Sequence, residues 1–323
     1  MKRRMLLKSG IVGATSVLGT GQALAQDRTV RLIVPFAVGG STDILARALA
    51  EQMRRLTGQN YIIDNKPGGA GKVANELALA AKPDGRTLLV NVASNYTLVP
   101  HTQKEPSQRS FTTFMPVSAL SVLDFALYVR PNISANTLQE YLQLVRKDPQ
   151  IGFYSTSALG NITHFCGLML ASATKLQLQD VPFQGGGPAI LAVISGHVPA
   201  GISSVSTPLI QAHNEGRVRI LAMMSSKRSR FLPNVPTMTE SGLPEMTLSD
   251  WIGIFAPPGT PAPMIDSINN LVTEVHKQPS FASALTQIML EEMMAGPAEC
   301  AVRLQRDYAV WQPIAKASGF ISG

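Results

Sequence analysis

The sequence predicts an α/β fold with two lobes. The main observation is two series in which strands and helices alternate over short connections, one in the first third of the chain and one in its middle. Alternation of this kind predicts a parallel sheet covered by helices on both faces. A chain of 323 residues, 45% hydrophobic and 15% charged, is also long enough to divide its core between two domains. We therefore expect two α/β lobes with a cleft between them.

The first third supplies the clearest elements. A β-rich run at 29–35 ends in a proline and is followed by a glycine loop, and 41–56 has apolar residues at helical spacing on one face. Gly58 then provides a helix stop. A strand at 61–64, a short helix at 73–81 and a strand at 87–91 complete this series, with turns between them.

The middle and the last third repeat the alternation. The patterns predict strands at 126–129, 151–154, 219–224 and 251–256, and helices at 137–147, 163–173, 187–194, 263–277 and 298–317. The helix at 187–194 has a proline in its first turn, which is a favoured position. Two α/β units in series are the basis for expecting two lobes.

The first 25 residues predict a secretory signal peptide. A basic head that includes Arg3 and Arg4 precedes a short apolar run, and the triplet 23–25 has small residues where signal peptidase cleaves. The apolar run is shorter than the roughly 20 residues that a membrane span requires. The twin-arginine route and the general secretory route both remain open, because Leu6 stands where the twin-arginine pattern usually has Phe. We expect an exported, periplasmic protein that starts at residue 26.

The charge and the cysteines exclude other classes. The net charge of +7 falls to +3 when residues 1–25 are removed, because that segment has four basic residues and no acid. The short basic run at 227–230 is typical of a solvated loop, so no nucleic-acid partner is expected. Cys166 and Cys300 do not form a Cys-x-x-Cys pair, and the sequence leaves open whether they meet.

The loop at 35–43 is the main candidate for binding chemistry. A strand that ends in a glycine turn and leads directly into a helix exposes backbone N–H groups that favour an anion, most simply a carboxylate. Gly39 and Gly40 let a ligand approach the backbone, and the hydroxyls of Ser41 and Thr42 can add donors. The alternative is a plain capped helix in which Asp43 bonds the first-turn amides.

A second loop at 155–164 has the same place between a strand and a helix. It is rich in hydroxyls and carries an Asn and a His. If it faces the first loop, the two helix ends would hold the two ends of a dicarboxylate. The alternative for His164 is a buried or capping histidine.

Catalytic and metal sites are not expected. Residues 67–72 resemble a phosphate loop, but Lys66 and Val73 stand where that pattern requires Gly and Ser or Thr. There is no Gly-x-Ser-x-Gly elbow, and the five histidines lack the spacing of a zinc site. The sequence supplies no nucleophile with its base, so we expect no catalytic residue, no metal and no cofactor.

Several motifs in matching order resemble one known family. At 35–47, 64–71, 82–89, 228–242 and 251–261 the chain is similar to the extracytoplasmic receptors of tripartite tricarboxylate transporters, the Bug-type family. The resemblance implies a periplasmic-binding-protein-like (type II) Venus flytrap fold, with two α/β lobes joined by crossing strands. We expect lobe 1 to comprise 26–125 plus 247–323, and lobe 2 to comprise 126–246.

The resemblance also implies the ligand and the site. Family members bind di- or tricarboxylates, acidic amino acids or aromatic acids, mainly with the loops matched by 35–43 and 155–164, and commonly with the loop at 94–96. The site residues carried over are Phe36, Gly39, Gly40, Ser41, Thr42, Asp43, Ser94, Ser157, Gly160, Asn161, Thr163 and His164.

The second lobe departs from the family pattern at several positions. Ala158 replaces a glycine and Asn161 a threonine, where the distal end of a ligand would lie, and Ala192 and Pro199 stand at two positions that are usually acidic. Ala158 has less backbone freedom than glycine, and Asn161 offers an amide in place of a hydroxyl. These changes predict a shifted ligand preference with binding of the proximal carboxylate kept.

The sequence therefore predicts a receptor that captures a small organic acid and delivers it to a membrane permease with a large and a small subunit. It is expected to act as a monomer, without cofactor or nucleic acid. One alternative is a sensory receptor that passes the ligand signal to a signalling partner. Others are an orphan binding protein without a permease, and a hydrolase or transferase on the same fold.

Overall fold

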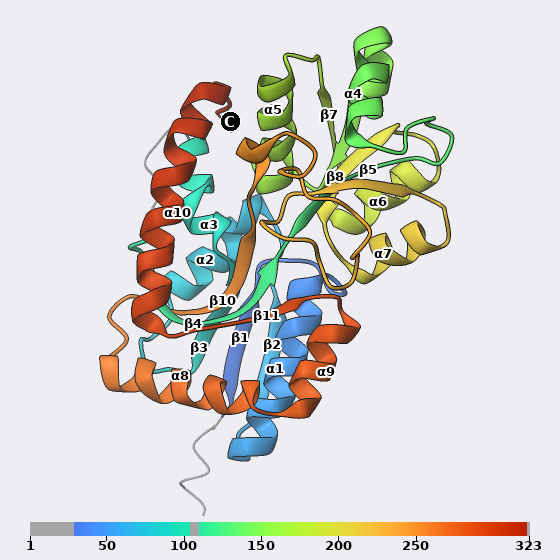
Figure 1. Cartoon of the computed structure of the whole chain (residues 1–323). Coiled ribbons are helices and arrows are strands. Elements are labelled where there is room, and N and C mark those ends of the chain that lie inside the picture. Colours follow the sequence, from blue (N-terminus) through green and yellow to red (C-terminus); the bar gives the residue numbers. More distant parts are fainter. Residues whose placement is uncertain (1–28, 104–109, 322–323) are drawn as a thin grey trace, which may run out of the picture.

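The computed structural model describes residues 29–103 and 110–321, which form two α/β lobes (Figure 1). The predicted signal peptide lies outside these residues. We call the part built on the first sheet lobe 1. Its six strands lie in the order β11-β4-β10-β3-β1-β2. They are β1 (Val30–Val34), β2 (Tyr61–Asn65), β3 (Thr87–Val92), β4 (Met115–Leu123), β10 (Asp250–Ala256) and β11 (Glu291–Ala295).

The sheet of lobe 1 is mixed, so the expectation of a wholly parallel sheet is wrong. β1 runs parallel to β2 and β3, as the alternation of strands and helices predicted. β10 is antiparallel to both β3 and β4, and β11 is antiparallel to β4. The reason is topological, because β10 enters this sheet from the other lobe and not by a right-handed crossover from a neighbouring strand.

Helices cover both faces of the lobe 1 sheet. α1, α8 and α9 contact one another, while α2 contacts β1 and β3, and α10 contacts α3 and β4. α1 begins at Ser41 and ends at Thr57, followed by Gly58 at φ 68°, as expected for a glycine stop. The elements are α1 (Ser41–Thr57), η1 (Gly69–Gly71), α2 (Lys72–Leu79), α3 (Ser94–Thr97), η2 (Val99–Thr102), α8 (Ala262–His276), α9 (Pro279–Gln287) and α10 (Pro297–Ser318).

Lobe 2 is built on a five-stranded mixed sheet with the order β7-β6-β8-β5-β9. β6 is parallel to β7 and β8, whereas β5 is antiparallel to β8 and β9. Its strands are β5 (Phe125–Val129), β6 (Phe153–Thr156), β7 (Gln179–Pro182), β8 (Ala200–Ser204) and β9 (Arg219–Met223). The predicted strand at 151–154 is shifted, because a 3₁₀ turn that starts at a proline (η3, Pro149–Gly152) takes its first two residues.

The helices of lobe 2 are α4 (Leu138–Lys147), α5 (Ile162–Thr174), α6 (Gly186–Ile194) and α7 (Thr207–Asn214), with a 3₁₀ turn η4 (Pro244–Met246) before the return to lobe 1. α5 packs closely on β6 because Gly167 faces the ring of Tyr154. A Cβ at Gly167 would lie 2.0 Å from Cζ of Tyr154. Helix α5 is therefore held against the sheet at the strand whose end leads into it.

The chain crosses between the lobes twice, and the two crossings lie side by side. Asp124 alone separates the end of β4 from the start of β5. On the way back, the Leu248 N–H donates to the carbonyl of Met224, whose own N–H donates to the carbonyl of Phe125, at 2.7 and 2.8 Å. The crossing strands expected for this fold are thus present, as adjacent segments tied by backbone hydrogen bonds.

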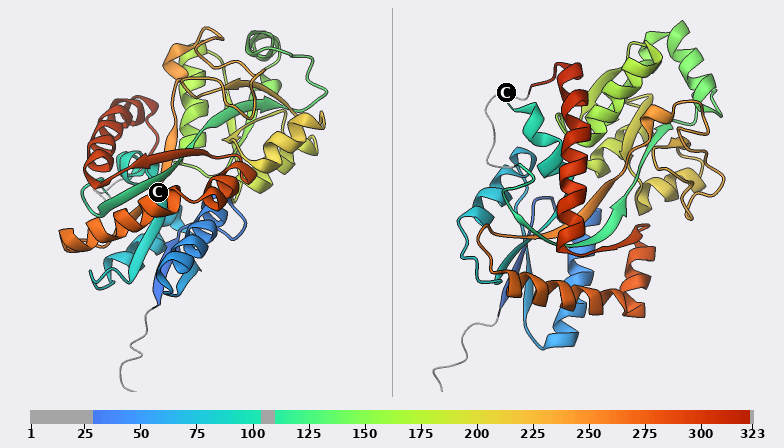
Figure 2. Two further views of the ribbon diagram at one scale, coloured as in Figure 1. Left: turned by 60° about the horizontal axis from the view of Figure 1, so that its bottom comes forward. Right: turned by 60° about the vertical axis from the view of Figure 1, so that its left-hand side comes forward.

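Helix α10 lies along lobe 1 and reaches lobe 2 with its last turns (Figure 2). Trp311 of α10 packs edge-on against Phe165 of α5, with ring centroids 6.3 Å apart. One continuous hydrophobic cluster therefore contains residues of both lobes.

Cys166 lies in that cluster and Cys300 in a separate one, and both are free thiols. Burial raises the pKa of both thiols.

Candidate functional site

The register of the two sheets places the carboxyl ends of their parallel strands at the junction of the lobes. In lobe 1, Val92 at the end of β3 pairs with Ile252 near the start of β10, where the chain arrives from lobe 2. β1 is parallel to β3, so its carboxyl end lies at the same edge. In lobe 2, the end of β8 pairs with Phe125 at the start of β5, and β6 and β7 run parallel to β8. The loops after β1, β3, β6 and β7 therefore lie at facing edges of the two sheets (Figure 1).

Asp43 organises the loop between β1 and α1. Its carboxylate is fully buried and accepts hydrogen bonds from the N–H of Gly39 (2.9 Å), from Asn65 Nδ2 (2.9 Å) and from Arg47 Nε (3.0 Å). Gly39 has φ 88°, a conformation that suits glycine. The buried carboxylate thus fixes a turn that is itself exposed to solvent.

The pKa of the Asp43 carboxyl reflects this arrangement. Burial alone would raise its pKa, but the hydrogen bonds from Arg47, Gly39 and Asn65 outweigh burial and hold the pKa below its usual value. Asp43 is therefore a fixed anion whose acceptor positions are already used by the protein. In this geometry it positions the loop and does not offer a contact to another carboxylate.

The first turn of α1 remains available. The N-cap is Gly40, which has no side chain to cap the helix, and Asp43 bonds the glycine before the cap and not the first-turn amides. The alternative of a plain capped helix therefore does not describe this loop. Gly40 is exposed, Ser41 is half-buried, Thr42 is buried and Phe36 is half-buried below the turn. Unpaired N–H groups at a helix start are the groups that bind anions.

In the second loop, Asn161 is the N-cap of α5. Its Oδ1 accepts from the N–H of His164 (3.1 Å) and from Thr163 Oγ1 (2.9 Å), and its Nδ2 donates to Ser157 Oγ (2.6 Å). The hydroxyl of Thr163 also accepts from the N–H of Ser157 (3.2 Å). The polar side chains of this loop are thus bonded to one another, and they rigidify the backbone around the start of α5.

His164 closes the second loop. The N–H of Gly160 donates to Nδ1 of His164 at 3.2 Å, so the neutral ring carries its proton on Nε2, which lies 3.6 Å from Asp180 Oδ1. Burial lowers the pKa of His164, and the charge of Asp180 opposes this only in part. Gly160 is buried, with φ 74°. The alternative of a buried structural histidine fits this geometry.

Both lobes use the same local device. In each loop a glycine with positive φ precedes the N-cap, and its N–H donates to the side chain of the third residue of the helix: Gly39 to Asp43, and Gly160 to His164. We call each of these a glycine lock. In each lobe the locking side chain also faces the edge strand beside it, through Asn65 at the end of β2 or Asp180 in β7. The locks hold the turns, so the first-turn amides keep fixed directions.

A third helix start was not anticipated as part of the site. α6 begins after β7 at the same edge of the sheet, with Gly185 as N-cap at φ 110° and no side-chain cap. A Cβ added at Gly185, Gly186 or Gly187 would meet no atom within 4 Å, so space is open around these backbone groups. The N–H of Gly185 donates to the carbonyl of Ser157 (2.9 Å), which joins this corner to the second loop. The signal available in the sequence was three consecutive glycines at a helix start, followed by a proline in the first turn.

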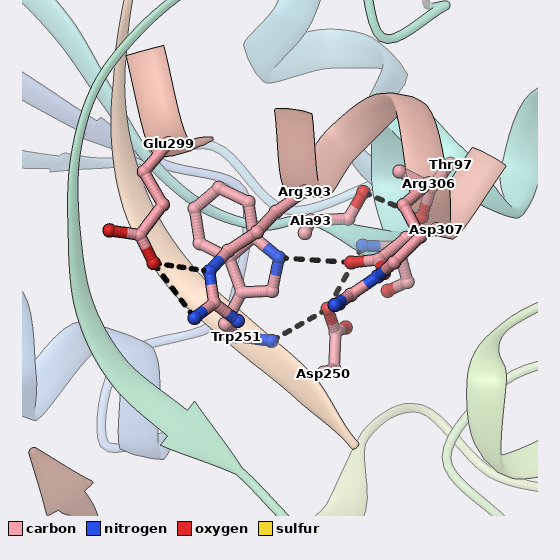
Figure 3. A network of polar contacts seen from close by, with 9 residues as sticks. Ala93, Thr97, Asp250, Trp251, Glu299, Arg303, Arg306 and Asp307 are labelled. Carbon is pink, nitrogen blue, oxygen red and sulfur yellow. Dashed lines mark hydrogen bonds and ion pairs between the residues drawn. The ribbon is translucent and has the colours of Figure 1, made fainter. Parts of the chain in front are cut away.

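Ser94 is the first residue of α3, directly after β3, and is buried. Its N–H donates to Asp250 Oδ1 (3.1 Å), which also accepts from the N–H of Trp251 (2.8 Å). Trp251 Nε1 in turn donates to Asp307 Oδ2 on α10 (3.3 Å), as Figure 3 shows. Burial raises the pKa of Asp250 to about 6. The structure thus places Ser94 in a network that ties α3, β10 and α10 together beside the crossing.

Two of the departures from the family pattern lie away from the loops. Ala192 is buried in the lobe 2 core, and Pro199 precedes β8, whose amino end is at the opposite edge of the sheet. Ala158 lies within the second loop, where its carbonyl accepts from Thr156 Oγ1 (3.4 Å).

Within residues 29–103 and 110–321 no group of three or more His, Cys, Asp or Glu could hold a metal ion, and no helix is long and apolar enough to cross a bilayer.

Residues 45–320 match the model of the tripartite tricarboxylate transporter family receptor, TctC. The periplasmic binding protein BugD is 29% identical with a TM-score of 0.82, over 91% of this chain and 99% of that chain. MatC from Rhodopseudomonas palustris, solved with bound malate, is 28% identical with a TM-score of 0.80, over 89% and 98%.

Another structure from R. palustris, solved with adipate, is 27% identical with a TM-score of 0.83, over 91% of this chain and 98% of that chain. These similarities span both lobes and both sheets. With the family model covering most of its length, this chain belongs to the TctC family of tripartite tricarboxylate transporter receptors, which are solute-binding proteins and not enzymes.

Proposed function

We propose that this protein is a periplasmic receptor that captures one small organic acid between its lobes and delivers it to a tripartite tricarboxylate-type permease. The family, the malate and adipate in two similar structures, and the signal-like first 25 residues support this proposal. The proposed limits are 26–125 plus 247–323 for lobe 1 and 126–246 for lobe 2. The short crossings, at Asp124 and between η4 and β10 (247–249), support those limits.

The observation that carries the proposal is the set of helix starts at the facing edges. α1 and α6 have glycine N-caps without side-chain caps, and α5 keeps the amides of its first two residues clear of the Asn161 cap. A helix start stabilises a nearby anion by about 0.3–1 kcal/mol when exposed and by up to about 2 kcal/mol when sheltered. Two carboxylates, one at each lobe, would therefore be held without a lysine or an arginine.

Lobe closure follows from the same arrangement. A ligand that contacts α1 from lobe 1 and α5 or α6 from lobe 2 makes both sets of contacts only when the lobes approach each other. Such a ligand favours the closed state by the free energy of the contacts that the open state lacks. The two adjacent crossings supply the hinge.

The proposal is tested by a thermal-shift screen of residues 26–323 against malate, adipate, other mono-, di- and tricarboxylates, and their amide and alcohol analogues. A ligand at about 100 times its Kd stabilises the folded state by about 2.7 kcal/mol, which raises Tm by several degrees. We expect stabilisation by acids and not by their neutral analogues. Stabilisation by neutral compounds alone would overturn the carboxylate assignment.

A substitution at Ser41 separates backbone from side-chain binding. Gly40 has φ −74° and ψ 161°, which suits a residue before proline, so Ser41→Pro keeps the helix start while removing its N–H. We expect Ser41→Ala, which removes only the hydroxyl, to weaken binding of the acid by a few fold. We expect Ser41→Pro to weaken it by about tenfold or more, because this change removes the backbone N–H in addition to the hydroxyl. Calorimetric titration measures both, with Tm as the control for folding. Equal affinity in Ser41→Pro and wild type would rule out the Ser41 N–H as a ligand donor.

His164 predicts a pH dependence. Burial lowers its pKa from 6.5, so the unfolded chain takes up the proton first as the pH falls. The stability that neutral His164 supplies is complete above pH 6.5 and is lost as the pH drops through the lower pKa of the folded state. Protonation would also place a hydrogen on Nδ1 and break the hydrogen bond from the Gly160 N–H. The affinity of the protein for its organic acid should therefore fall over the same pH range.

The measurement is the free energy of unfolding in urea, with the Kd of the bound acid, from about pH 5 to pH 8 for wild type and His164→Gln. Burial raises the pKa values of Asp124 and Asp250 to about 6, so these two groups make the folded state more stable as the pH falls and oppose the effect of His164. Because both groups are present in wild type and in His164→Gln, the difference between the two proteins reports the histidine alone. We expect the acid-side loss to be smaller in His164→Gln. Superimposable pH profiles would contradict the lock at His164.

A further inference from the structure

The end of helix α10 makes an unexpected contact with the second loop. α10 ends at Ser318, and Gly319 with φ 65° turns the chain back. The N–H of Phe320 donates to Ser318 Oγ at 3.1 Å, which fixes the turn. Phe320 is half-buried, and its ring packs on lobe 2, although α10 contacts β4 and α3 of lobe 1 along its length.

Phe320 touches both members of the glycine lock in lobe 2. Its ring lies edge-on to the imidazole of His164, with centroids 4.7 Å apart and planes at 73°. A Cβ built at Gly160 would lie 3.0 Å from Cε1 of Phe320, so the ring also covers the glycine. Phe165 completes the cluster at 6.0 Å from Phe320. The aromatic ring thus shields from water the hydrogen bond from Gly160 to His164.

We propose that Phe320 is a positioning residue for ligand binding, which holds the Gly160–His164 lock and thereby the start of α5 in its binding geometry. The proposal rests on the proposed function of that corner as a ligand site. It assigns to the end of α10 a role in affinity that acts through His164 and not through contact with the ligand. It also means that a helix packed on lobe 1 supports a binding loop of lobe 2.

The groups around His164 make the proposal measurable. From β7, Asp180 approaches Nε2, and from β6, the Tyr154 hydroxyl donates to the His164 carbonyl at 3.2 Å. From α10, Phe320 covers the ring. Within the described parts of the chain, Asp180 is the charged group that acts on the His164 pKa, while burial lowers it. Removal of the Phe320 ring would expose the imidazole and raise its pKa toward the ordinary value.

The test compares Phe320→Ala with the conservative Phe320→Leu and with Ile321→Ala, a matched control at the exposed neighbouring residue. Three quantities are measured: amide exchange at Gly160 and the NMR titration of the His164 ring, both without ligand, and the Kd for adipate and malate. For Phe320→Ala we expect faster exchange at Gly160, a raised His164 pKa and affinity weaker by about two- to tenfold. Phe320→Leu should fall in between, and Ile321→Ala should match wild type.

A lower Tm in Phe320→Ala with unchanged Gly160 exchange and unchanged His164 titration would overturn the proposal, because Phe320 would then contribute only to global stability. If Gly160 exchange and the His164 titration both change while the Kd does not, Phe320 holds the lock but the lock does not affect ligand affinity, and that part of the proposal is overturned. If wild type binds neither adipate nor malate, nor any other acid, the proposed function fails. In that event the two ligand-free measurements still decide whether Phe320 holds the lock.

Discussion

The double crossing of the chain between the sheets is the constraint on which the rest of the structure depends. Asp124 joins β4 to β5 without a loop, and the return at Met224 and Leu248 is hydrogen-bonded to the start of β5. With these two segments side by side, the registers of both sheets are set relative to the junction of the lobes. The carboxyl ends of β1, β3, β6 and β7 then all point to that junction. In open α/β sheets, this is the edge at which ligands bind.

The glycine locks hold the turns before α1 and α5, so the backbone N–H groups at these helix starts keep fixed directions. Asp43 and His164 differ in charge, yet each accepts from the N–H of a glycine four residues earlier and each is buried. A charged lock suits lobe 1, where Arg47 and Asn65 compensate the carboxylate. A neutral lock in lobe 2 makes that corner sensitive to protonation and to the cover that Phe320 provides. Fixed amides lose little freedom when an anion binds, which favours affinity.

Local patterns in the sequence predicted much of this fold. The amphipathic helix at 41–57 and its glycine stop follow from periodicity, and the loops at 35–43 and 155–164 could be singled out because each joins a strand to a helix. β11, with the sequence Glu-Glu-Met-Met-Ala, carries no strand signal and is a strand because it pairs with β4. The antiparallel direction of β10 also depends on a crossing that no local pattern encodes.

The site was predictable as a set of loops but not as a set of roles. Asp43 and His164 were expected at the ligand, and their locking bonds involve glycines close in sequence. What fixes their roles is Asn65 and Asp180, which come from neighbouring strands and are visible only in the folded chain. The same holds for Phe320, which lies 156 residues after His164 in the sequence and 4.7 Å from it between ring centroids.

The central claim is that backbone amides from both lobes hold the ligand. It is tested most directly by titrating the ¹⁵N-labelled protein, residues 26–323, with the acid that stabilises it most. The amide signals followed are those of Ser41 and Thr42 in lobe 1 and those of Ile162, Thr163, Gly186 and Gly187 in lobe 2. The account predicts that the α1 signals shift together with the lobe 2 signals, from α5, α6 or both, with a single saturation curve. Saturable binding that leaves either set unchanged would contradict it.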